Sequence, residues 1–130
     1  MIRYTTLLLA LFTLLTAATC NPKIETALAA NCFKGKLVIK GICMNYVVQL
    51  EEGDSTRLQL ARTWIDETTD KTYNNVFALA SKCNFPEMQE GDEFYFTVSE
   101  TDTTNCNVCM AYRPVPDARN FIVVNKERCP

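Results

Sequence analysis

Seven cysteines, at positions 20, 32, 43, 83, 106, 109 and 129, are the residues of this 130-residue chain whose type and spacing offer distinct chemistry. A thiol can form a disulfide, ligate a metal, act as a redox nucleophile or carry a lipid. Cys106 and Cys109 have the spacing of a redox pair, but a thioredoxin-like motif needs a strand before it and a helix after it. Residues 101–105 are polar and residues 110–112 are typical of a strand, so redox catalysis is disfavoured. A structural zinc site would need a second close pair of cysteines, to which the eleven-residue separation of positions 32 and 43 is a weak match.

Disulfide formation is the chemistry expected of the six cysteines in the stretch 32–129, namely Cys32, Cys43, Cys83, Cys106, Cys109 and Cys129. Such a density in one small domain is typical of exported proteins that are held together by cross-links. Three bridges at about 2–4 kcal/mol each would together contribute on the order of 6–12 kcal/mol, comparable with the whole net stability of a domain. The connectivity stays open, except that we expect Cys129 to be joined back to the body because a free tail would fray.

Residues 1–19 have the features of an export signal. Arg3 is the only charged residue before Lys23, and it is followed by an apolar run over residues 7–15. Because a spanning helix needs about 20 predominantly apolar residues, this run is too short to cross a membrane. We therefore expect a cleaved signal peptide and an exported protein.

Cys20 is the odd cysteine, and its position suggests a use for its sulfur. Residues 15–20 resemble a bacterial lipoprotein box, although Thr19 stands where such boxes usually have Gly, Ala or Ser. The sequence thus predicts lipidation of Cys20 and a membrane anchor, with residues 20–31 as a tether. The alternative is ordinary cleavage after Ala18, which would leave a secreted protein whose Cys20 thiol is free or bonded to another molecule.

The chain contains no histidine, which excludes a Ser-His-Asp or Cys-His triad and a histidine-ligated metal centre. Asp66, Glu67 and Asp70 cluster on a polar reversal, but their spacing misses the calcium-loop pattern. Asp92 and Glu93 do not differ from ordinary surface acids. We accordingly predict no catalytic residue, no metal and no cofactor.

Aromatic side chains and one loop are the candidate binding features. A stacking platform for sugars or bases could be drawn from Trp64, Tyr73, Tyr95 and Tyr112, although packing in the core or at an edge is the more economical use of these rings. Residues 20–130 carry 12 basic and 15 acidic side chains, so a net charge of −3 disfavours nucleic acid as a partner. The loop 114–120 is stiffened by proline, and its candidate partner-contact residues are Arg113, Pro114, Pro116 and Arg119. It is equally a plain hairpin loop.

Short runs of β-forming residues separated by turns fill residues 32–130, which we expect to form one disulfide-rich β-domain. The run 73–80 is ambiguous, because Asn75 could instead cap a short helix. Strands are expected over residues 35–50 with a bend at Gly41, over 56–66, 73–80 and 93–99, and in a closing hairpin of 109–113 with 121–125.

Five or six such strands, the first long and bent, could curl into a small closed sheet and so avoid exposed edges. The expected fold is therefore an all-β, disulfide-stapled, OB-like barrel of five to six strands. A two-sheet β-sandwich is the alternative, because periodicity alone does not separate the two architectures.

Four segments, residues 32–35, 40–46, 90–96 and 106–112, resemble an uncharacterised group of small cysteine-rich bacterial lipoproteins. The resemblance implies an envelope location and a disulfide frame, and it supplies no catalytic residue. The expected function is a lipid-anchored, non-enzymatic binding or structural module of the cell envelope, with an envelope protein or a glycan as partner. The alternative is a secreted protease-inhibitor-like domain.

Overall fold

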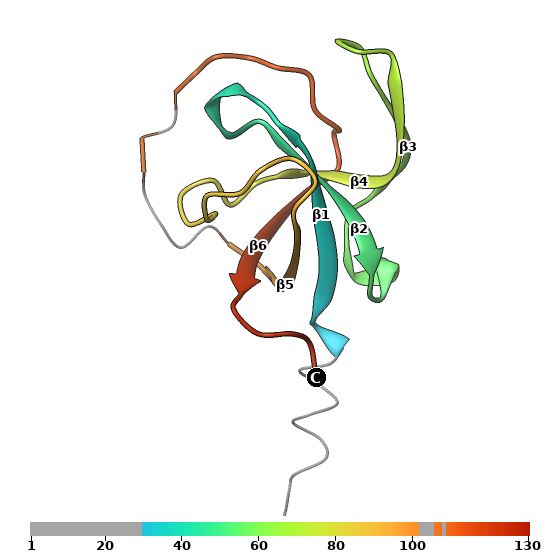
Figure 1. Ribbon diagram of the computed structural model, residues 1–130, viewed down its shortest axis with the longest axis vertical. Helices are drawn as coiled ribbons and strands as arrows, with labels where there is room; N and C mark the ends of the chain where they lie inside the picture. The colour runs from blue at the N-terminus through green and yellow to red at the C-terminus, as the bar shows by residue number, and fades with distance from the viewer. Residues whose placement is uncertain (1–29, 102–105, 108) are drawn as a thin grey trace, which may run out of the picture.

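The computed structural model describes residues 30–101, 106–107 and 109–130. The predicted signal peptide, Cys20 and residues 21–29 of the predicted tether lie outside the described residues. The described chain forms six strands and two short 3-10 helices (Figure 1). The strands are β1 (Phe33–Lys40), β2 (Tyr46–Glu52), β3 (Ala61–Asp66), β4 (Lys71–Leu79), β5 (Glu93–Ser99) and β6 (Arg119–Asn125), and the 3-10 helices are η1 (Ile42–Met44) and η2 (Ser55–Arg57).

Five of the strands pair in a closed ring, in the order β1, β2, β4, β6, β5 and back to β1. All of these pairs are antiparallel except β4–β6, which is parallel. The sixth strand, β3, pairs only with β4 and forms a hairpin that extends from the ring. This arrangement confirms the prediction of an all-β, disulfide-stapled domain of five to six strands whose sheet curls on itself.

The interior of the ring is filled by alternate residues of the strands. Along β1 and at the start of β5, buried and less buried residues alternate, as a sheet with one buried face requires. Phe96 lies at the centre, with its ring centroid 5.3 Å from that of Phe33 and 5.9 Å from those of Phe77 and Phe94. A second, smaller group of buried residues consists of Ile39, Val47 and Val76.

The chain does bend at Gly41 as predicted, but the bend is a full reversal, so residues 35–50 are two strands rather than one long strand. β1 and β2 are antiparallel neighbours joined by η1. A Cβ at Gly41 would collide with the backbone oxygen of Asn45, so this turn can close only over glycine. Cys43 and Met44 complete the reversal with φ of 55° and 58°.

The predicted strand over residues 56–66 begins only at Ala61. Before Ala61, backbone amides and carbonyls are hydrogen-bonded to side chains or within η2 instead of to a neighbouring strand. Asp54 caps η2 by accepting a hydrogen bond from the Thr56 amide at 3.0 Å. The amide of Gln59 donates to the side chain of Asn120, and its carbonyl accepts from the same side chain at 2.8 Å. A side chain from β6 therefore replaces a neighbouring strand at this point.

The predicted closing hairpin of residues 109–113 with 121–125 is also wrong. Residues 109–118 contain no strand, and β6 pairs instead with β5 and β4. The disulfide from Cys109 to Cys43 and hydrogen bonds of Ala111 to Cys43 and Asn45 hold this segment beside the β1–β2 turn. The helical alternative for residues 73–80 is excluded, because these residues belong to β4 except for the last.

Three disulfides join Cys32 to Cys129, Cys43 to Cys109 and Cys83 to Cys106. The first confirms that Cys129 is joined back to the body. It also holds the C-terminus beside the start of β1, at the end of the molecule opposite the β1–β2 turn (Figure 1).

The three disulfides close loops of different length, and a longer loop loses more entropy in the unfolded chain when it is closed. The bridge that closes the longest loop should therefore stabilise the fold most. Replacing Cys32 and Cys129 by serine opens a loop spanning 97 positions and should lower the free energy of unfolding by about 5 kcal/mol. The same change at Cys83 and Cys106, which are 23 positions apart, should cost about 3 kcal/mol. Urea unfolding of the two double variants measures the difference. A larger loss for the shorter loop would show that native contacts, rather than the unfolded chain, set the effect.

Candidate functional site

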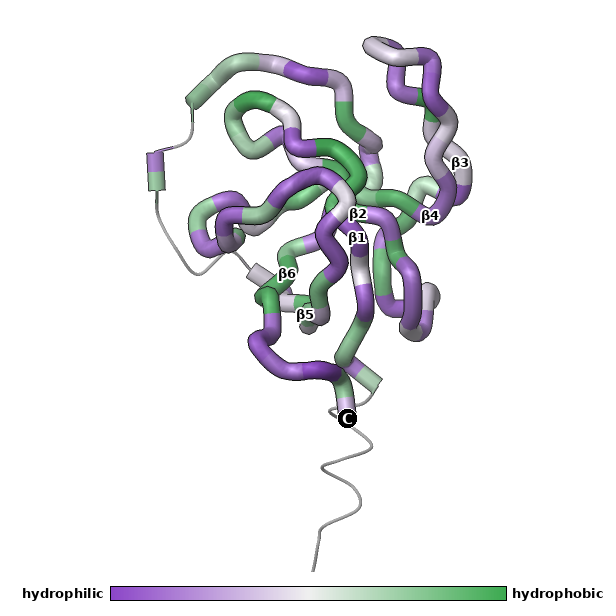
Figure 2. Tube along the Cα trace, viewed as in Figure 1, coloured by the Kyte–Doolittle hydropathy of each residue, from purple (hydrophilic) through white to green (hydrophobic). Residues whose placement is uncertain are grey.

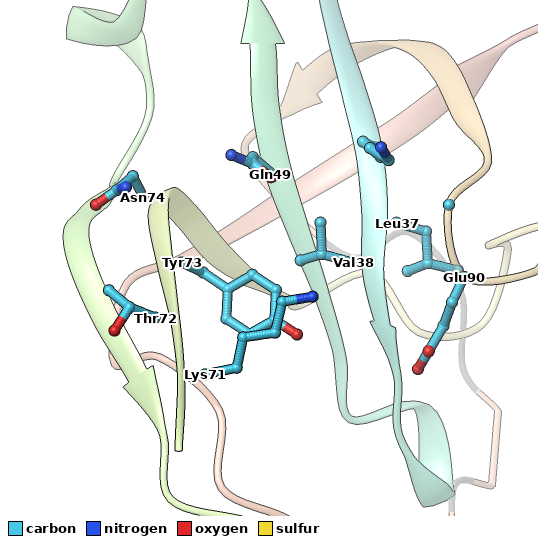
Figure 3. A pocket seen from close by; sticks show the side chains of 10 residues that line it. Leu37, Val38, Gln49, Lys71, Thr72, Tyr73, Asn74 and Glu90 are labelled. Atoms are coloured by element: carbon cyan, nitrogen blue, oxygen red, sulfur yellow. The ribbon is translucent and has the colours of Figure 1, made fainter. Parts of the chain in front are cut away.

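A groove of about 420 Å³ opens between the outer face of β1 and β2 and the first half of β4 (Figure 3). The turn before β5 closes one edge of the groove with Gly91. Two backbone hydrogen bonds, between Leu37 and residues 91 and 92, hold this turn against β1. The lining residues are Lys36, Leu37 and Val38 of β1, Gln49 of β2, Lys71, Thr72, Tyr73 and Asn74 of β4, and Glu90 with Gly91.

The groove exists because β4 leaves the ring partway along its length. β4 pairs with β2 only from Val76 to Ala78, and before Val76 it continues with β3 as a two-stranded ribbon. Asn75, at the point of departure, has a φ of 53°, a left-handed conformation that asparagine tolerates better than most residues. The kink at Asn75 therefore separates the ribbon from β2 and forms one wall of the groove.

Tyr73 is the aromatic member of that wall. Its ring lies beside that of its cross-strand neighbour Trp64, with centroids 6.1 Å apart and an interplanar angle of 29°. The ammonium of Lys71 lies over the Tyr73 ring, 5.0 Å from its centroid. Of the four aromatic residues considered as a platform, the structure brings only Trp64 and Tyr73 together, since Tyr95 belongs to β5 and Tyr112 follows the Cys43–Cys109 bridge.

Two lysines reach the groove from opposite walls. Within the described part of the chain, neither Lys36 nor Lys71 forms an ion pair. Glu93, which is opposite Lys36 in the β1–β5 register, directs its carboxylate to Lys34 at 2.6 Å. The hydrogen bond from Lys34, followed by the charge of Lys34, holds the pKa of Glu93 below its usual value. Neither lysine is therefore neutralised by an ion pair, although the charge of Lys36 also helps to lower the pKa of Glu93.

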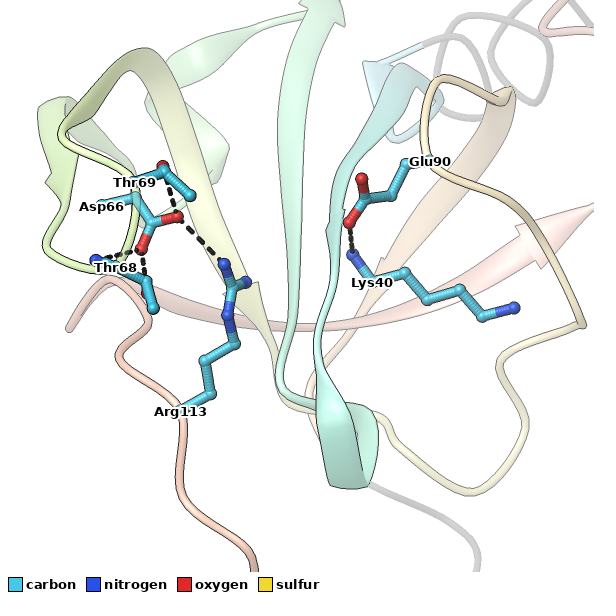
Figure 4. A network of polar contacts seen from close by, with 6 residues as sticks. All are labelled: Lys40, Asp66, Thr68, Thr69, Glu90 and Arg113. Carbon is cyan, nitrogen blue, oxygen red and sulfur yellow. Dashed lines mark hydrogen bonds and ion pairs between the residues drawn. The ribbon is translucent and has the colours of Figure 1, made fainter.

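Among the residues that the structure describes, Asp66 is the buried carboxylate, with its side chain 1% exposed at the end of β3 (Figure 4). One oxygen accepts hydrogen bonds from the amide and hydroxyl of Thr68 at 3.1 and 2.7 Å. The other accepts from the hydroxyl of Thr69 and from Nη2 of Arg113, each at 2.9 Å. Burial raises the pKa of Asp66, but these hydrogen bonds and the Arg113 charge outweigh it, so the pKa is lowered.

The Asp66 network involves one member of the acidic cluster that the sequence singled out. The acidic cluster of Asp66, Glu67 and Asp70 does not converge, because the Asp66 carboxylate is taken up by four internal donors. The structure places no group of three or more metal-ligating side chains together among the residues it describes.

The four residues of the predicted contact loop have different surroundings. Arg113 is bound to Asp66, and Pro116 is fully buried. Pro114 is half-buried, and Arg119 is exposed at the start of β6. Arg113 and Pro116 thus serve the fold, while a partner contact through Pro114 and Arg119 stays a prediction.

Sequence reasoning missed an exposed apolar surface around the Cys43–Cys109 disulfide. Ile42 is 61% exposed, Met110 95% and Tyr112 84%. The two stretches that carry them are hydrophobic neighbours at the end of the molecule away from the C-terminus (Figure 2). We call Ile42, Met110 and Tyr112 the distal surface. A strand-like pattern in residues 109–113 hid it, because in a strand half of these side chains would be covered.

Cys106 and Cys109 do not form a redox pair, since they are bonded to Cys83 and Cys43 respectively. Among the residues that the structure describes, no helix is long and apolar enough to cross a membrane. Comparison of the chain with models of protein families, with curated proteins and with solved structures gave no match. The residues themselves must therefore carry any functional argument.

The Asp66 network makes a pH-dependent contribution to stability. Asp66→Asn should lower the free energy of unfolding by about 3 kcal/mol at neutral pH, because it leaves the Arg113 charge without its buried partner. The folded-state pKa of Asp66 is depressed, so its contribution is present above the unfolded value of about 3.9 and is lost as pH falls through the lower folded value. Urea unfolding of both proteins between neutral and acid pH measures this.

Glu87→Gln is the matched control, because its carboxylate is 89% exposed and its ion pair with Lys40 lies at the surface. It should leave stability almost unchanged. A stability difference between the native protein and Asp66→Asn that stays constant down to acid pH would contradict the depressed pKa.

Proposed function

We propose that the protein is an exported module of the cell envelope, anchored through lipid on Cys20, that acts by binding rather than by catalysis. The observation that carries the proposal is the pairing of all six domain cysteines in three internal disulfides. Such cross-links persist in oxidising compartments outside the cytosol. Because all six cysteines of the domain are paired with one another, none of them is left as a disulfide partner for Cys20. This supports a separate use for the sulfur of Cys20.

The placement of the domain's ends supports an anchored arrangement. The Cys32–Cys129 bridge brings the start of the domain and its C-terminus to one end of the molecule, and Cys20 precedes Cys32 by 12 positions. The distal surface lies at the opposite end (Figure 1). A domain anchored through Cys20 would present this opposite end away from the attachment point.

The chemistry of the described side chains favours binding. A general acid or base needs a proton-accepting atom that a substrate can reach. The buried carboxylate of Asp66 has its oxygens committed to Thr68, Thr69 and Arg113. The groove, in contrast, presents lysines, amides and an aromatic ring, which are groups that recognise ligands.

A second candidate function is a secreted protein-binding inhibitor, favoured by the distal surface. Ile42 precedes Cys43 and Met110 follows Cys109, and these two cysteines form one disulfide. The disulfide therefore fixes the backbone beside two side chains that are exposed and apolar. Rigid, exposed apolar side chains are suited to insertion into the pockets of a partner protein. The two candidates differ at Cys20, because the inhibitor would be released from the membrane.

Replacing Cys20 separates the two candidates. When the full chain is expressed in a bacterial host, we expect it in the membrane fraction, with an intact mass that includes acyl groups. Cys20→Ser should move the protein to the soluble exported fraction, because the sulfur that carries the lipid is absent. Thr19→Ala keeps the cysteine and restores a usual box residue, so it is the matched control and should stay in the membrane.

Recovery of the unchanged chain as a soluble protein with an unmodified thiol would overturn the lipid anchor and favour the secreted inhibitor. Domain cysteines that react with an alkylating reagent in the denatured, unreduced protein would overturn export as well, because the disulfide argument would fail.

A further inference from the structure

We propose that the groove between β1, β2 and the first half of β4 binds a carbohydrate segment that bears carboxylates. The inference rests on the proposed function, since it names the ligand class that an envelope-binding module would recognise. It depends on three properties of the described residues: two unpaired ammonium groups, an accessible aromatic ring, and polar groups along the walls.

The ammonium groups select for negative charge. Lys36 of β1 and Lys71 of β4 both line the groove, and Figure 3 labels Lys71 beside Tyr73. The ion pairs of the described chain include neither lysine. Glu93, the acidic residue nearest to Lys36 in the sheet register, is bound to Lys34. With two lysines against the single carboxylate of Glu90, the charged groups of the lining are net positive, and such an excess attracts an oppositely charged ligand and sets its orientation.

Tyr73 and its neighbours select for a sugar ring. The ammonium of Lys71 already lies over the Tyr73 ring. A sugar that stacked on Tyr73 would take this place and bring its carboxylate to Lys71. Gln49, Thr72 and Asn74 supply amide and hydroxyl groups along the same groove, and such groups both donate to and accept from hydroxyls.

Other polymers fit these walls less well. The groove lining contains one aromatic ring, that of Tyr73, whereas a single-stranded nucleic acid stacks successive bases on several aromatic side chains. An extended peptide would need pockets for apolar anchors, whereas the aliphatic lining is limited to Leu37 and Val38.

Glu90 provides a test in the opposite direction. It lies at the edge of the groove, and its Oε1 accepts a hydrogen bond from the backbone amide of Lys40 at 2.8 Å (Figure 4). Its charge opposes a ligand carboxylate. Glu90→Gln removes that charge while it keeps an oxygen for the Lys40 amide, so an acidic ligand should bind more tightly to this variant.

The experiment uses the exported chain with Cys20→Ser, which remains soluble, and two probes of equal length: a tetramer of galacturonic acid and a tetramer of galactose with the same linkage. Calorimetric titration should detect binding of the acidic tetramer, weakened by added salt. Lys36→Gln and Lys71→Gln should each weaken it about fivefold, and Glu90→Gln should strengthen it by a similar factor. Tyr73→Leu should weaken it on the order of tenfold through loss of stacking.

Lys126→Gln is the matched control, because Lys126 is exposed outside the groove lining, and it should not change the affinity. Thermal unfolding of Tyr73→Leu checks that the variant is folded. The proposal would be overturned if the galactose tetramer bound as tightly as the acidic tetramer, or if the acidic tetramer did not bind. A third probe, tetrapolyphosphate, tests for charge alone. The proposal would also be overturned if tetrapolyphosphate bound with the same affinity as the acidic tetramer and this affinity were unchanged in Tyr73→Leu. The Cys20 fractionation does not involve the groove, so the anchor and the ligand can fail separately.

Discussion

Closure of the ring depends on the parallel pairing of β4 with β6, because this pair joins the two halves of the sheet. The amide of Ala78 donates to the carbonyl of Ala118 at 2.8 Å, and that of Ala80 donates to Asn120 at 3.0 Å. The Ser81 hydroxyl continues the contact by both donating to and accepting from the backbone of Ile122. A strand that is parallel to β4 must arrive by a connection that crosses the molecule, and ordering such a connection costs entropy. The Cys43–Cys109 disulfide and the Asp66–Arg113 ion pair hold this connection at two points before β6, so they favour the pairing that closes the ring.

The same closure determines where the groove lies. β2 has β1 on one side and β4 on the other, but only three residues of β4 pair with it. Before Val76, β4 pairs with β3, and the resulting ribbon forms the wall of the groove opposite β1. Asp66 and Arg113 tie the end of this ribbon to the segment before β6, and Trp64 packs beside Tyr73 along it. The β3–β4 ribbon is therefore joined to the ring where β4 pairs with β2, and to the segment before β6 at its other end. These two attachments fix the position of Tyr73 relative to β1.

Local patterns predicted those parts of the fold that are decided locally. The alternation of Phe94 and Phe96 against Tyr95 identified β5, and the cysteine count predicted the cross-linked β-domain. Prediction failed where a residue distant in the sequence determines the backbone conformation. The side chain of Asn120 forms the hydrogen bonds of the Gln59 backbone that a neighbouring strand would otherwise form. The disulfide to Cys43 holds Cys109 beside the β1–β2 turn rather than in a hairpin with β6. The groove could not be predicted either. It requires Lys36 and Lys71 to face each other across strands that diverge, and the divergence arises from a left-handed Asn75 that the sequence also allowed as a helix cap.

The covalent frame also explains how so small a domain tolerates unfavourable local features beside its two surfaces. Cys43 and Met44, next to the exposed Ile42, adopt left-handed conformations that cost L-residues about 1–2 kcal/mol each. Asn75 has the same kind of conformation at the groove. In a domain of this size the apolar core alone leaves little excess stability, whereas three cross-links destabilise the unfolded chain without constraining the outer face of the sheet. Stability supplied through the unfolded state thus leaves the residues of the groove and the distal surface free to be selected for binding.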